Sequence, residues 1–80
     1  MKVTVKFFSI LKEIAGCGER IIHLEDKTTA AGLFAVLAEE YGFAPYCGTV
    51  RFALNREYVA ETQFLSDGDE IAFITPVAGG

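Results

Sequence analysis

Apolar and polar residues alternate near both ends of this 80-residue chain. Val3, Val5 and Phe7 alternate with Thr4 and Lys6, so they share one face, and Phe8 falls on the other. A period of two is typical of a strand with one buried face. Similar patterns and turn residues predict five strands, over residues 3–8, 19–24, 50–54, 58–60 and 70–74.

One long helix is predicted over residues 30–41. Apolar residues recur there at helical spacing, Thr28 or Thr29 can cap its start, and Gly42 is a natural stop. Gly32 inside the helix costs about 1 kcal/mol relative to Ala. A short helical turn is predicted after the first strand, with Ser9 as its cap.

The order of elements predicts the fold class. Two strands, a helix and further strands that return beside the first give a mixed sheet with the helix packed across one face. This is an α+β, ubiquitin-like β-grasp arrangement of four to five strands with one main helix. We expect residues 1–74 to form this domain and residues 75–80 to form a flexible C-terminal tail.

Charge and composition exclude several classes of function. The net charge is −4 and the seven Lys and Arg residues are scattered, so no basic stripe is available for nucleic acid. Polar residues interrupt the N-terminus, which predicts neither a signal peptide nor a membrane span, and we expect a cytoplasmic protein. Cys17, Cys47 and the lone His23 lack metal-ligand spacing, so free thiols and no metal site are expected.

The chain ends in Gly79-Gly80, which has a chemical meaning in this context. A tail that must enter a narrow active site of another protein cannot carry Cβ atoms near its reacting carbon, and Pro76 can stiffen its base. The Gly80 carboxylate is a poor electrophile and needs activation, most simply as an acyl-adenylate. The chain has no G-x-x-x-x-G-K-[ST] loop for ATP. A separate enzyme must therefore activate the tail.

The run over residues 67–80 (DGDEIAFITPVAGG) resembles the C-terminus of the MoaD/ThiS sulfur carriers, and most closely that of molybdopterin synthase small subunits. The start, VKFF at residues 5–8 followed by LKEIAG at residues 11–16, resembles them too. This likeness implies that an E1-like adenylyltransferase activates Gly80 with ATP and that sulfur converts it to a thiocarboxylate. The carrier itself is then expected to bind no cofactor.

The resemblance also implies a partner and a destination for the sulfur. The tail would enter a large subunit, within a heterotetramer, and donate sulfur to cyclic pyranopterin monophosphate in molybdenum cofactor biosynthesis. Catalytic side chains would lie on that large subunit, so whether this chain counts as an enzyme is open.

The strand pattern and the resemblance together predict a partner-binding surface on the outward face of the sheet. An ordinary solvated turn is an equally good interpretation of the acidic residues at 67–70. The residues proposed for partner binding are Phe8, Tyr58, Ile74, Pro76, Val77, Asp67 and Asp69.

Three alternatives remain open from the sequence. The chain could be a thiamine-pathway sulfur carrier with the same tail chemistry. It could be a ubiquitin-like modifier that is conjugated to protein lysines. It could also be a non-covalent β-grasp interaction module with a fortuitous Gly-Gly end.

Overall fold

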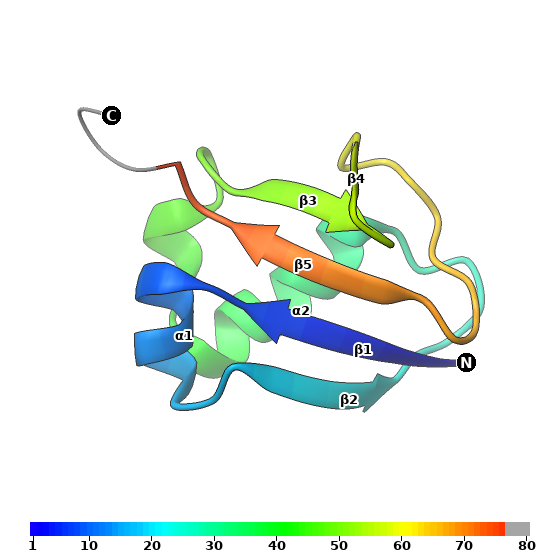
Figure 1. Ribbon diagram of the computed structural model, residues 1–80, viewed down its shortest axis with the longest axis horizontal. Coiled ribbons are helices and arrows are strands. Elements are labelled where there is room, and N and C mark those ends of the chain that lie inside the picture. Colours follow the sequence, from blue (N-terminus) through cyan, green and yellow to red (C-terminus); the bar gives the residue numbers. More distant parts are fainter. Residues whose placement is uncertain (77–80) are drawn as a thin grey trace.

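Five strands form one mixed sheet in the order β2-β1-β5-β3-β4 (Figure 1). The computed structural model describes residues 1–76. The central strands β1 and β5 run parallel, and the other neighbours are antiparallel. The strands are β1 (Lys2–Phe7), β2 (Glu19–His23), β3 (Arg51–Leu54), β4 (Glu57–Val59) and β5 (Glu70–Ile74). The predicted β-grasp class is confirmed, with five strands.

Helices cover one face of this sheet and leave the other open. The main helix α2 (Ala30–Tyr41) crosses the covered face, while α1 (Ser9–Ala15) and the short 3₁₀ helix η1 (Ala44–Tyr46) lie toward the end at which β1 and β5 finish (Figure 1). The predicted Ser9 cap is wrong. Phe8 occupies the cap position of α1 without a side-chain hydrogen bond, and Ser9 has a φ of 50°. The sharp turn out of β1 decides this local conformation.

The ends of α2 are as the sequence predicts. The Gly32 N–H donates to Thr29 Oγ1 at 3.0 Å, which makes Thr29 the N-cap. A Cβ on Gly32 would lie only 3.2 Å from that oxygen, so the glycine leaves room for the cap. At the other end, Gly42 has a φ of 82° and its N–H donates to the Ala38 carbonyl, as is common for glycine after a helix.

The core between α2 and the sheet is rich in aromatic rings. Phe7, Phe34 and Phe73 meet at mostly edge-to-face angles, the arrangement that ring quadrupoles favour. Phe43 is fully buried and packs on Phe7 and Phe34. The sequence pattern missed this residue and the η1 turn, because a single buried residue in a loop carries no periodicity.

Candidate functional site

The end of β5 defines where the C-terminal segment leaves the domain. β5 lies between β1 and β3, and its last residue, Ile74, pairs with Arg51 at the start of β3. Because β5 runs parallel to β1, Phe7 pairs with Phe73 and Phe8 follows beside Ile74. Thr75 and Pro76 then continue outside regular structure at this end of the sheet (Figure 1). The central strand therefore directs the tail from the middle of the sheet.

A shallow depression, which we call the outer hollow, lies on the open face beside this exit. Ala53 of β3 and Ala72 of β5 pair directly, and their small side chains leave space between larger neighbours. Its volume is about 370 Å³. Phe8, Ala53, Tyr58, Ala72 and Ile74 supply the apolar lining, and Lys6, Arg56 and Glu70 supply the polar lining.

The outer hollow contains side chains with the exposure expected of a binding surface. Tyr58 is 72% exposed and Phe8 is 44% exposed, although both are large apolar residues. Ile74 is half-buried and Pro76 is exposed. A second hollow of about 400 Å³ shares Tyr58 and Ile74 and extends to Pro76. Large exposed apolar groups that gather in one place indicate a site for a protein partner.

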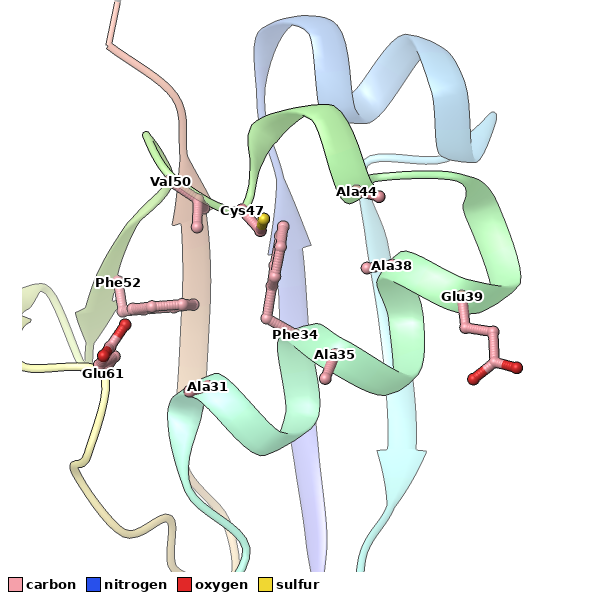
Figure 2. A pocket seen from close by; sticks show the side chains of 10 residues that line it. All are labelled: Ala31, Phe34, Ala35, Ala38, Glu39, Ala44, Cys47, Val50, Phe52 and Glu61. Carbon is pink, nitrogen blue, oxygen red and sulfur yellow. The ribbon is translucent and has the colours of Figure 1, made fainter.

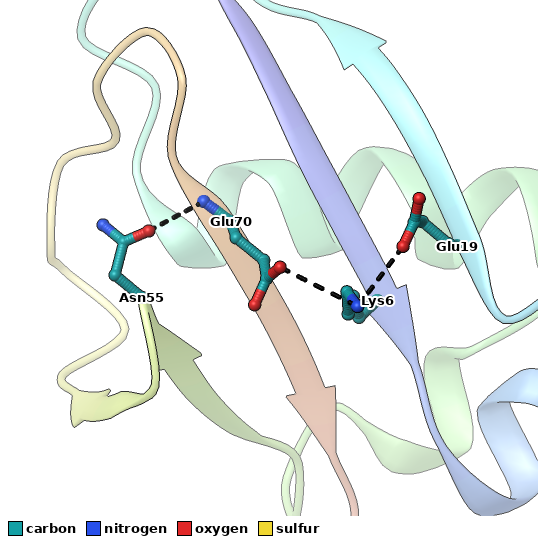
Figure 3. A network of polar contacts seen from close by, with 4 residues as sticks. All are labelled: Lys6, Glu19, Asn55 and Glu70. Carbon is teal, nitrogen blue, oxygen red and sulfur yellow. Dashed lines mark hydrogen bonds and ion pairs between the residues drawn. The ribbon is translucent and has the colours of Figure 1, made fainter.

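Ion pairs border the outer hollow on the side of β2. Lys6 Nζ lies 3.3 Å from Glu19 Oε1 and 3.8 Å from Glu70 Oε1, so one ammonium bridges two carboxylates across three strands (Figure 3). All three side chains are partly exposed, and such pairs contribute at most about 1 kcal/mol each. Their role here is to place charge at the border of an apolar depression.

Asp67 and Asp69 lie at the opposite end of the sheet from Pro76. They precede β5, and its five residues separate them from the tail by about 15 Å or more. Their carboxylates already accept hydrogen bonds within the domain, Asp67 from the backbone N–H of Lys2 and Asp69 from that of Ser66. The structure therefore brings together Phe8, Tyr58, Ile74 and Pro76 but not the two aspartates.

Val77, Gly79 and Gly80 lie outside the described residues, so the predicted reactive end and the tail beyond Pro76 stay predictions. Sequence reasoning missed Ala53 and Ala72, which form the floor of the outer hollow. Alanines facing outward from the middle of two adjacent strands were the available signal, because outward positions are usually polar.

On the helix side, a hollow of about 440 Å³ is mostly apolar (Figure 2). Its walls come from α2, from β3, from the segment between them and from Glu61 after β4. Cys47 is its only sulfur-bearing residue, and both Cys47 and Cys17 are free thiols, as predicted. Within residues 1–76, no cluster of His, Cys, Asp or Glu could hold a metal ion. Its titratable side chains, Glu39, Cys47 and Glu61, lie apart from one another, so they form no catalytic group (Figure 2).

Two further features concern the described part of the chain. The Arg20 guanidinium donates hydrogen bonds to Glu40 and Tyr41. These bonds, the one to Glu40 most, raise the pKa of Arg20 above its ordinary value, so this side chain stays charged. No helix within residues 1–76 has the length and apolar character needed to cross a membrane.

A β-grasp domain with a partner surface beside its C-terminal exit defines the class of ubiquitin-like carrier and modifier proteins. Within this class the chain belongs to the ThiS family, which matches residues 5–80.

Individual relatives agree with this assignment. The molybdopterin synthase sulfur carrier subunit of Chlamydomonas reinhardtii is 36% identical, with all of both chains covered. A chain in the complex of subunits 1 and 2 of molybdopterin-converting factor from Helicobacter pylori 26695 is 32% identical, with a TM-score of 0.71 and all of both chains covered. The small archaeal modifier protein 1 of Methanosarcina acetivorans is 26% identical, with a TM-score of 0.77, and the match covers 99% of this chain and 96% of that one.

Proposed function

We propose that this chain is the sulfur carrier subunit of a molybdopterin synthase. Its C-terminal Gly80 carries sulfur as a thiocarboxylate and gives it to cyclic pyranopterin monophosphate, held by a large subunit with which the carrier forms a heterotetramer. The observation that supports this most is the position of Pro76, which lies at the exit of β5 and lines a hollow together with Tyr58 and Ile74, next to the apolar outer hollow. A partner bound on the outer hollow would have the tail beside its own surface.

Activation of Gly80 takes two successive reactions. The Gly80 carboxylate oxygen attacks the α-phosphorus of ATP on an E1-like adenylyltransferase, and pyrophosphate leaves. A donor of sulfur at the oxidation level of hydrosulfide then attacks the glycyl carbonyl, and AMP leaves with the former carboxylate oxygen. ATP is thus a substrate of the activating enzyme. In this proposal the large subunit supplies the catalytic side chains for the later transfer.

Intact mass spectrometry tests the proposal. The protein is incubated with its activating enzyme, ATP and a sulfide source, and the expected mass corresponds to one oxygen replaced by sulfur at the C-terminus. A chain that lacks Gly80 is the matched control and should keep its mass. An unchanged mass of the full chain under conditions in which AMP is released would count against sulfur transfer.

The likeness to the archaeal modifier supports a second candidate function, conjugation to protein lysines. The two are separated by where the Gly80 acyl group goes after adenylation. Isopeptide-linked Gly-Gly remnants on lysines of other proteins, found by peptide mass spectrometry in the native cell, would favour the modifier. A thiocarboxylate with co-purification of a thiazole synthase would instead favour the thiamine pathway.

A further inference from the structure

The edge strand β2 has backbone groups that face away from the sheet. It is the outermost strand on one side, and among residues 1–76 only β1 pairs with it. The Leu24 N–H donates to the Met1 carbonyl at 2.7 Å, and the Phe7 N–H donates to the Gly18 carbonyl at 2.9 Å. Along an antiparallel strand, the backbone N–H and C=O groups of successive residues point alternately toward the paired strand and away from it. The backbone groups of Arg20 and Ile22 therefore bond to β1, and those of Glu19, Ile21 and His23 point away from the sheet.

The outward set of residues is self-complementary. Two copies of β2 can be paired antiparallel so that Ile21 lies opposite Ile21 of the other copy. Glu19 of each copy then lies opposite His23 of the other. Each of these three pairs would exchange two backbone hydrogen bonds, because all the groups involved point outward. A shift of the centre by one residue, to Arg20 or Ile22, would leave only two such pairs within residues 19–23 in place of three.

The side chains favour the same register. Ile21 is 57% exposed on the open face, where its copy would cover it. Glu19 also lies on this face, held by Lys6, and an imidazole N–H of His23 from the other copy can donate to its carboxylate. Arg20 leaves the edge clear, because it bonds to Glu40 at 2.6 Å and to Tyr41 at 2.8 Å on α2.

We propose that β2 pairs antiparallel with β2 of a second copy of this chain, about a twofold axis at Ile21, so that two sheets become one. Natural edge strands commonly carry proline, bulges or lysines that block such pairing, and residues 19–23 (ERIIH) contain none of these. The outer hollow lies toward β4, the opposite edge, so both copies keep that surface free. The inference is independent of the tail chemistry.

The contact is short, so the dimer is weak. A five-residue strand pair is small beside standard interfaces of about 1,600 Å². We expect a dissociation constant on the order of 0.1–1 mM. Sedimentation velocity of the full chain should show a coefficient that rises with concentration over this range.

Two lysine substitutions form a matched comparison. Ile21→Lys puts two ammonium groups opposite each other and should keep the protein monomeric at every concentration. Val36→Lys makes the same chemical change at a 62% exposed site on α2 and should associate like the parent. Circular dichroism checks that both fold. Removal of Gly79-Gly80 should leave association unchanged although it abolishes sulfur loading, so the two proposals fail separately.

Disulfide trapping tests the register in a Cys17→Ser, Cys47→Ser background. Directly opposed residues have Cα atoms about 5.5 Å apart, within disulfide range. Ile21→Cys should cross-link to itself under mild oxidation far faster than Val36→Cys. Glu19→Cys mixed with His23→Cys should cross-link, whereas each alone should not, since like positions lie about 14 Å apart. A monomer at 1 mM, or equal rates for Ile21→Cys and Val36→Cys, would overturn the proposal.

Discussion

Asn55 Nδ2 donates a hydrogen bond to Asp69 Oδ1 at 3.0 Å. Asn55 Oδ1 accepts a hydrogen bond from the Glu70 N–H at 3.0 Å. One side chain therefore bonds to the first residue of β5 and to the residue just before it. Asn55 and Arg56 have φ values of 49° and 73° and form the tight turn between β3 and β4, where such values are usual for Asn and rare for Arg. These bonds fix the β3–β4 hairpin, which carries Tyr58, to the central strand.

Asn55→Ala should lower the free energy of unfolding by about 1–3 kcal/mol, because it removes both bonds and strains a positive-φ position. Asn55→Gly relieves the strain and isolates the loss of the side-chain bonds. Urea unfolding followed by circular dichroism measures both. If Asn55→Gly is as stable as the parent, the bonds to Asp69 and Glu70 contribute nothing and this account of the turn is wrong.

Gly32→Ala should not give the usual gain of about 1 kcal/mol for a helix interior. The new Cβ would crowd Thr29 Oγ1 at 3.2 Å and weaken a cap that contributes about 1 kcal/mol. In a Thr29→Ala background the crowded oxygen is absent, so Gly32→Ala should then stabilise by about 1 kcal/mol. A thermal-denaturation double-mutant cycle tests this, and additive effects of the two substitutions would contradict the coupling.

Phe43→Ala should destabilise the domain by about 3–5 kcal/mol, a large part of the stability of a chain this short. The ring is fully buried against Phe7 and Phe34, and its loss leaves a cavity. Phe64→Ala is the matched control, because Phe64 is 58% exposed and should change stability by less than about 1 kcal/mol. Similar losses in the two variants would show that the cluster does not hold the loop after α2 in place.

Ile74→Glu and Phe8→Glu should each weaken binding of the large subunit at least tenfold and leave the fold intact. A carboxylate placed in an apolar contact lacks a partner once water is excluded. Isothermal titration calorimetry with the large subunit measures this, with Val36→Glu on α2 as the control. Unfolding of Phe8→Glu or Ile74→Glu would show that these side chains support the core. Full binding by both folded variants would place the contact elsewhere.

Local patterns in the sequence predicted much of the fold. Alternation at Val3, Val5 and Phe7 defined β1, and Thr29 and Gly42 bounded α2, because caps and periodicity act over a few residues. The same alternation placed Phe8 and Ile74 on the outward side of the sheet. The short-range signals failed at Ser9, where the turn out of β1 sets the backbone, and at Phe43, whose burial depends on residues far away in sequence.

The sequence by itself determined the Gly79-Gly80 end, the absence of a nucleotide-binding loop and the order of helices and strands along the chain. Only the tertiary structure decided that Ala53 and Ala72 meet to form the outer hollow, and that the aspartates at 67 and 69 bond within the domain at the far end from Pro76. It also decided that Glu19, Ile21 and His23 form a self-complementary edge. The physical reason is that strand pairing joins residues distant in the chain, and no local pattern encodes which groups remain unpaired.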